Sequence, residues 1–365
     1  MLRTFIKAAV IPLILAFSCS GMHRPALDQD FIDPCDGRSH DCASDTIKAL
    51  ESALLERGAD PEIYRRLAVC YRAAGTPGSR LRSMQAIDMA IELDPDNPLF
   101  HVEKGLTLYA GQFTGSAIMS LDRAIRIDPG CFQAWYQKGR IEKDLYLRDM
   151  CSERHLEDAI RFFSRADDIC GDHDETLFWI GLLQYLRGRL DISASYALRG
   201  EELYPASFRY RMLSSCVALE SMRFEDASEG FELALALMDG NTRDMYEDVS
   251  MLLPDIEIDR YIHLDGRNWY EFNRKFWVMN DPTPATILNE RRLEHYRRIF
   301  LASELLSDKR LDIEGAGTSR GAAIVSYGLP DAIILDMGSG LDGPFVVWTY
   351  LRGENTLLLL SLIHI

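Results

Sequence analysis

The sequence lacks several features that mark enzymes and nucleic-acid-binding proteins. Its 40 Lys and Arg are outnumbered by 56 Asp and Glu, so the net charge of −16 leaves no excess of cations for a nucleic-acid backbone. It contains no glycine-rich phosphate loop and no His-Glu-x-x-His motif, and its eight histidines form no pair at metal-ligand spacing on one helix. We therefore expect no enzymatic activity, no metal, no other cofactor and no nucleic-acid partner.

Long apolar runs are also missing. The apolar stretch near the N-terminus, Ala8–Phe17, has ten residues. It is too short to cross about 30 Å of hydrocarbon. Arg3 and Lys7 precede it, as in the positively charged start of a signal peptide. Residues 15–19, Leu-Ala-Phe-Ser-Cys, resemble the lipobox of bacterial lipoproteins, in which the cysteine becomes the lipidated first residue of the mature chain.

This resemblance implies a lipoprotein signal peptide over residues 1–18, lipidation at Cys19 and a polar tether over residues 19–44. The alternative is plain secretion with an unmodified Cys19. Ser20 stands where an Asp would resemble an inner-membrane retention signal. We therefore expect an outer-membrane lipoprotein of the cell envelope that faces the periplasm and touches the membrane through its N-terminal lipid.

The middle of the chain repeats itself every 34 residues. Pro95 and Pro129 are 34 residues apart, as are Ala90 and Ala124. This period, with small residues at fixed places, resembles the tetratricopeptide repeat (TPR), a hairpin of two antiparallel helices that stacks on its neighbours. We expect five such hairpins within residues 45–240, the third with eight extra residues between its helices.

A lone amphipathic helix over residues 45–57 is expected to cap these hairpins. The concave surface of such a solenoid is lined mainly by the first helix of each hairpin. Repeat position assigns the following side chains to it: Arg65, Arg72, Leu99, Val102, Tyr136, Arg140, Lys143, Phe178 and Tyr185. In an acidic protein this combination suits an acidic tail or an extended peptide, so we expect an envelope protein or peptide as the partner in this groove. The alternative is that each side chain only packs or is solvated.

The remaining cysteines allow two disulfides. Cys131 and Cys170 are expected at ends of the third hairpin that lie side by side, which makes a disulfide between them reasonable. Cys35 and Cys42 in the tether are either a small disulfide loop or two thiols. Within the predicted helices, the thiol of Cys70 is expected to be buried and inert. The same expectation holds for Cys216.

The repeat ends at Gly240. Residues 241–265 are acidic and predict a linker with short helical pieces. An amphipathic helix is expected to begin at Asn289-Glu290. Further on, apolar runs bounded by turn residues predict strands over 322–327, 333–335, 345–350 and 356–360.

Short motifs follow one another in this C-terminal part. They are Phe276-Trp277, Asp281-Pro282-Thr283-Pro284, Asn289-Glu290, Tyr296-Arg297-Arg298, Arg320-Gly321, Tyr327-Gly328, Pro330-Asp331-Ala332-Ile333 and Trp348-x-Tyr350. Over residues 266–365 their order and spacing resemble the GWxTD domain of Bacteroidetes-type envelope proteins. The family's Gly-Trp-x-Thr-Asp is replaced by Gly-Ala-Gly-Thr-Ser at 315–319. The resemblance implies an envelope-associated α+β module, and because residues 361–365 offer no closing turn we expect it to be truncated.

The best candidates for a polar site in this module are Arg320, Tyr327 and Asp331. We favour the interpretation that these side chains only stabilise turns. The sequence thus predicts a mainly α protein, a TPR helical solenoid followed by a small α+β domain. We expect it to act as a lipid-anchored, non-catalytic protein-interaction scaffold of the cell envelope. The alternative is that the C-terminal domain is a ligand-binding or hydrolytic module and the repeats are its adaptor.

Overall fold

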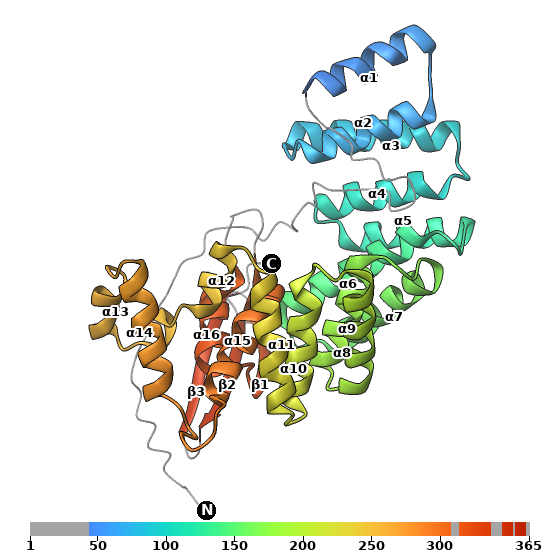
Figure 1. The fold of residues 1–365 in the computed structure, drawn as a ribbon. Helices are drawn as coiled ribbons and strands as arrows, with labels where there is room; N and C mark the ends of the chain where they lie inside the picture. The colour runs from blue at the N-terminus through green and yellow to red at the C-terminus, as the bar shows by residue number, and fades with distance from the viewer. Residues whose placement is uncertain (1–43, 308–313, 337–344, 353–354, 363–365) are drawn as a thin grey trace, which may run out of the picture.

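The computed structural model describes residues 44–307, 314–336, 345–352 and 355–362 (Figure 1). Helix α1 (Ser44–Arg57) is followed by five helical hairpins. They pair α2 (Pro61–Ala73) with α3 (Pro77–Leu93), α4 (Pro98–Ala110) with α5 (Thr114–Ile127), α6 (Phe132–Asp149) with α7 (Glu153–Ile169), α8 (Asp174–Leu186) with α9 (Leu190–Leu203), and α10 (Phe208–Glu220) with α11 (Phe224–Leu237). The predicted TPR solenoid is therefore confirmed.

Local sequence explains how each hairpin is bounded and closed. Asp60 caps α2 by accepting hydrogen bonds from the backbone N–H groups of Glu62 and Ile63. Small residues let the two helices of a hairpin approach. A Cβ on Gly139 of α6 would lie only 2.7 Å from the ring of Phe163 on α7.

The eight extra residues of the third hairpin lengthen its helices instead of adding a long loop. Helix α6 has 18 residues and α7 has 17, whereas α4 has 13 and α5 has 14. Met150 makes the turn between them in a left-handed conformation, with a φ of 58°. As a result, the tip of this hairpin projects beyond those of its neighbours.

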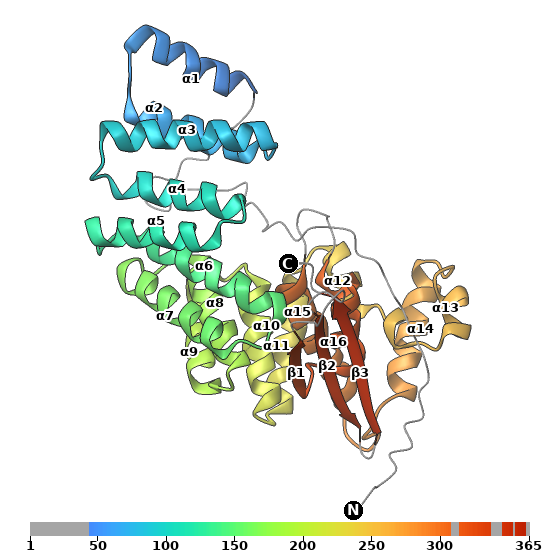
Figure 2. The ribbon, with the colours of Figure 1, turned by 180° about the vertical axis from the view of Figure 1, so that it is seen from behind.

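The C-terminal part begins with helices and ends in a sheet. Its elements are α12 (Gly240–Glu247), η1 (Ser250–Leu252), α13 (Asp255–Tyr261), α14 (Gly266–Met279), α15 (Glu290–Leu306), η2 (Gly315–Gly317), α16 (Ser319–Tyr327), β1 (Ala332–Asp336), β2 (Phe345–Arg352) and β3 (Asn355–Leu362). The antiparallel strands lie in the order β1-β2-β3, as Figure 2 shows. Alternate β2 side chains, among them Trp348 and Tyr350, are buried. No helix within the described ranges is long and apolar enough to span a bilayer.

Residues 322–327, predicted as a strand, belong to helix α16. Thr318 caps this helix by accepting from the N–H of Gly321, and Gly328 ends it with a φ of 86°. Its β-branched residues Ile324 and Val325 are buried, so packing decides the conformation in spite of their strand preference. The other predicted strands are confirmed as β1, β2 and β3, and α15 begins after its cap Asn289 as predicted.

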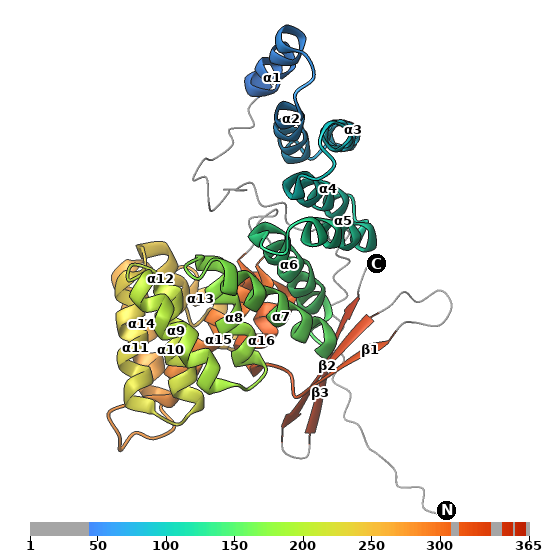
Figure 3. The same cartoon turned by 90° about the vertical axis from the view of Figure 1, so that its right-hand side faces the viewer.

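The buried residues fall into separate cores. One core surrounds α1 and the first hairpin, and another surrounds the second hairpin. The largest core runs without a break from the end of α6 through α11 into α15, α16 and β2. Figure 3 shows α1–α5 extending away from the body that the later elements form. The C-terminal part, apart from the small core around α13 and α14, is thus built onto hairpins three to five.

Candidate functional site

The inner face of the solenoid is formed by the first helices of the hairpins. Helix α2 packs directly on α4, α4 on α6, and α8 on α10. This places the first helices on the inside of the curve. At its C-terminal end this face is not empty, because α15 packs against both α10 and α11. A helix from the C-terminal part therefore packs on the fifth hairpin, and its side chains reach α8 of the fourth hairpin.

Arg209 of α10 is the centre of this contact. Its Nε and Nη2 donate to the two carboxylate oxygens of Glu304 on α15, at 3.0 and 2.9 Å. Its Nη1 donates to Glu175 of α8 at 2.7 Å. The guanidinium carbon lies 3.7 Å from the ring centroid of Phe178, which in turn meets Phe300 of α15 edge-on at 6.2 Å. One arginine thus binds α8, α10 and α15 together.

The network continues toward the third hairpin. Trp179 Nε1 donates to the second oxygen of Glu175 at 2.8 Å, and Lys143 Nζ lies 4.0 Å from the centroid of the Trp179 ring. Burial by itself would raise the pKa of Glu175, but the positive charge of Arg209 outweighs it and holds this pKa at about 2. The carboxylate therefore stays ionised throughout the physiological range.

A second contact lies about two helical turns earlier on α15. Arg297 donates to the hydroxyl of Tyr185 at 3.3 Å and is also hydrogen-bonded to Glu220. Burial raises the pKa of Tyr185 well above its usual range, so the phenol is neutral and acts as the acceptor. Arg297, Phe300 and Glu304 are spaced i, i+3 and i+7, which places them on one face of α15.

Phe178 and Tyr185 were expected to face a partner, and here the structure differs from the expectation. Both side chains are buried, and both touch α15 of the same chain. The sequence did not reveal this, because α15 lies far along the chain from α8. Arg209, Glu175 and Glu304 were missed for the same reason, although Arg209 and Glu175 occupy the same repeat position as Leu99.

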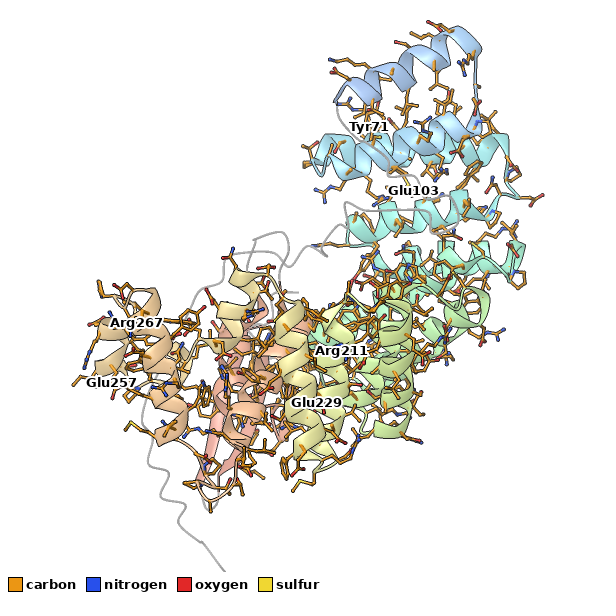
Figure 4. The ribbon with its side chains drawn as sticks, in the orientation of Figure 1. Tyr71, Glu103, Arg211, Glu229, Glu257 and Arg267 are labelled. Carbon is orange, nitrogen blue, oxygen red and sulfur yellow. The ribbon has the colours of Figure 1, made fainter. Side chains whose placement is uncertain are left out.

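The expected groove cations of the first hairpin are engaged within the chain. Arg72 Nε lies 2.7 Å from Glu103 Oε1, and both side chains are buried. Glu103 lies on α4, on the side that faces the first hairpin (Figure 4). Arg65 Nη2 lies 2.6 Å from Glu62. Val102 is buried in the core of the second hairpin. This end of the inner face is therefore held by ion pairs and apolar packing.

The third hairpin contributes aromatic and cationic side chains side by side. Tyr136 packs on Phe163 and on His173, with ring centroids 5.9 and 4.7 Å away. The guanidinium of Arg140 lies 5.8 Å from the Tyr136 ring. Lys143, one turn further, is 3.2 Å from Asp144 besides its contact with Trp179. Through Trp179, Lys143 connects this hairpin to the Glu175–Arg209 network.

Arg320, Tyr327 and Asp331 do not converge on one site. Arg320 Nη1 donates to the carbonyl of Arg148 at 2.9 Å, so this half-buried side chain binds the C-terminal end of α6. Asp331 accepts from the backbone N–H of Leu351 at 2.6 Å and joins β1 to β2. Tyr327 packs near Tyr350, with ring centroids 5.5 Å apart. Each of the three makes a different structural contact.

Residues 317–321 read Gly-Thr-Ser-Arg-Gly, which is the spacing of a hydrolase nucleophile elbow. An elbow places its serine between a strand and a helix. Here η2 precedes the helix, and Ser319 is an exposed first residue of α16. Across the described ranges no three His, Cys, Asp or Glu side chains are grouped so as to hold a metal ion.

Cys131 and Cys170 are thiols in the structure, so the disulfide that the sequence allowed is not formed. Cys131 Sγ donates to Gln133 at 3.8 Å, and Cys170 Sγ donates to Asp172 at 3.3 Å. Cys70 and Cys216 are buried, as predicted. Cys19, Cys35 and Cys42 lie outside the described residues.

Comparison with protein-family models finds no match, and no curated protein is recognisably related. Three solved structures illustrate what the fold resembles. YrrB, a TPR protein with an unusual peptide-binding site, is 17% identical with a TM-score of 0.42, over 55% of this chain and 97% of YrrB. PilF of Pseudomonas aeruginosa is 12% identical with a TM-score of 0.43, over 62% and 99% of the two chains. MamA is 18% identical with a TM-score of 0.41, over 48% and 91%. Likeness at this level says nothing about what this chain binds.

Proposed function

We propose that this protein is a protein-interaction scaffold whose inner face binds helical segments of partner proteins. The observation that carries the proposal is the seating of α15 across α8 and α10. That contact uses side chains of three kinds: a forked cation, an aromatic ring and a phenol, supplied by Arg209, Phe178 and Tyr185. A helix laid into a groove through anchors on one face is a common mode of protein recognition.

The contact also indicates what a partner helix carries. On α15 the anchors are a cation, an aromatic three residues later and a carboxylate four residues after that, at positions 297, 300 and 304. A partner that uses the inner face of the third hairpin meets Tyr136, Arg140 and Lys143, which favour an acidic segment with apolar anchors. We expect recognition to depend on both charge and aromatic packing.

Crosslinking followed by pull-down of the full chain tests this function. The chain with Arg140→Glu and Lys143→Glu is compared with a control with Arg161→Glu and Arg165→Glu on α7, the second helix of the same hairpin. We expect discrete partners to be captured by the wild type and by the control, and to be lost from the inner-face variant. Capture of the same partners by all three proteins would contradict the proposal.

We further propose that the scaffold is anchored in the cell envelope by a lipid on Cys19. The support is the lipobox-like sequence at residues 15–19 after a short apolar run. Metabolic labelling with a radioactive or clickable fatty acid is expected to mark the wild type and not a Cys19→Ala variant. The variant is also expected to leave the membrane fraction. Equal labelling of both proteins would contradict the anchor.

A further inference from the structure

The last two residues of α14, Val278 and Met279, and the connection to α15 together form a closed loop, residues 278–288. Asn289 Nδ2 donates to the carbonyl of Trp277 at 2.6 Å, so the two ends of the loop are tied together. Arg291 Nη1 adds a second tie by donating to Asn280 Oδ1 at 2.8 Å. A compact loop with joined ends holds a defined shape at the surface.

This loop presents apolar side chains to solvent. Met279 is 83% exposed, Val278 is 70% exposed and Ile287 is fully exposed. Pro282 and Pro284 between them are exposed as well. Isolated exposed apolar residues are ordinary, but a group of large ones within one short loop is typical of an interaction surface.

Several polar groups of the same loop are hydrogen-bonded, two of them to carboxylates: that of Asp281 within the loop and that of Glu290 on α15. The backbone N–H of Thr283 donates to Asp281 Oδ1 at 2.8 Å, and that of Thr286 donates to the carbonyl of Thr283 at 2.9 Å. The hydroxyl of Thr286 lies 3.0 Å from the carbonyl of Leu288. The two prolines carry no N–H at all. Because a polar group without a partner is costly to remove from water, these bonds reduce the cost of moving the loop into an apolar phase.

Two cations lie one helical turn behind the apolar residues. Arg274 precedes Val278 by four residues, and Lys275 precedes Met279 by four, which places each pair on the same side of α14. Both cations are exposed, and neither has an ion-pair partner in the described part of the chain. An apolar tip with basic residues just behind it matches the order of acyl chains and anionic headgroups at a bilayer surface.

We propose that the loop 278–288 inserts its tip into the surface of an anionic lipid bilayer, with Arg274 and Lys275 at the headgroups. A bilayer accounts for the apolar tip, for the internally bonded polar groups and for the cations behind it. A pocket in a partner protein would explain only the first of these. The inference goes beyond the helix-binding groove and uses the proposed lipid anchor only to bring the chain to a membrane.

Hydrogen exchange on the full chain, with and without vesicles, tests the proposal. Vesicles of phosphatidylcholine alone are compared with vesicles that also contain phosphatidylglycerol. Relative to the chain without vesicles, we expect the amides of the loop 278–288 to exchange about tenfold more slowly with the anionic vesicles. The neutral vesicles are expected to slow this exchange by a smaller factor. The paired change Met279→Asp and Ile287→Asp is expected to abolish this protection. Leu55→Asp, at an exposed site on the distant α1, is expected to leave it intact.

Unchanged exchange of the loop in a chain that sediments with vesicles would overturn the proposal. Protection that requires a protein extract and not lipid would also overturn it, because it would assign the loop to a protein partner. The anchor is measured separately, since sedimentation reports it and loop exchange does not. The groove is separate too, because Arg140→Glu with Lys143→Glu removes partner capture and is expected to leave loop protection unchanged.

Discussion

Replacement of Arg209 by alanine is the sharpest test of how α15 is held against α8 and α10. Two hydrogen bonds join this side chain to Glu304 and one joins it to Glu175. The Arg209 side chain is 22% exposed and that of Glu304 is 16% exposed. Removing one partner of such a largely buried pair costs about 3–5 kcal/mol, because the other charge is left unpaired.

Two further terms adjust this value only slightly. Because the Glu175 side chain is 42% exposed, water solvates its charge once Arg209 is removed. The loss of this pair therefore adds little to the free-energy cost. The contact of the guanidinium with Phe178 adds about 1 kcal/mol. We therefore expect R209A to lower the free energy of unfolding by about 4–6 kcal/mol in total. R209K keeps the positive charge but loses the bidentate geometry of the guanidinium. Its free energy of unfolding is expected to lie between those of the wild type and R209A.

Urea unfolding followed by tryptophan fluorescence measures this effect. All five tryptophans lie in α6 or beyond it, so their emission reports on the body that contains the groove and not on α1–α5. R223A is the matched control, because Arg223 pairs with Asp226 at the surface and its loss is expected to cost less than about 1 kcal/mol. If R209A were no more destabilising than R223A, the argument that Arg209 holds α15 would be refuted.

Three other predictions follow from the packing. Burial lowers the pKa of His295 to about 4 from the 6.5 of an exposed histidine. The unfolded chain therefore binds a proton first as the pH falls, and the free energy of unfolding is expected to drop by roughly 3 kcal/mol between pH 6.5 and 4. A urea midpoint series should show a flatter pH profile for His295→Phe. Gly200→Ala is expected to cost about 1–3 kcal/mol, since its Cβ would lie 2.1 Å from the Tyr210 ring, and thermal unfolding measures this loss. Finally, α1–α5 belong to cores separate from the main one, so hydrogen exchange is expected to be faster there than in α8–α11.

Each of these has its own control. For His295, an unchanged pH slope in the phenylalanine variant would contradict the prediction. Gly115→Ala is the control for Gly200, because nothing lies within 4 Å of the added Cβ, and it is expected to be neutral or slightly stabilising. Uniform exchange from α1 to α11 would contradict the separation of the cores.

The sequence predicts the hairpins well because their determinants are local. The 34-residue spacing of Pro95 and Pro129 is a property of neighbouring helices, and the cap Asn289 lies directly before α15. The groove is harder to predict, because its occupant comes from another part of the chain. Glu304 is 95 residues from Arg209, and neither residue alone indicates the pairing. The prediction of a strand over residues 322–327 was wrong for a related reason, since buried β-branched residues suit a packed helix as well as a strand.

The long third hairpin has a consequence for how this architecture can vary. Its extra helical turns end at the carbonyl that Arg320 binds, so this hairpin is matched in length to the module behind it. Among the described elements, the main contacts of the hairpins before it are with their immediate neighbours. Copies could therefore be gained or lost ahead of α6 without disturbing the body, and each copy would change how far the chain extends from it. A change in the length of the third hairpin would instead remove the contact of Arg320 with the end of α6.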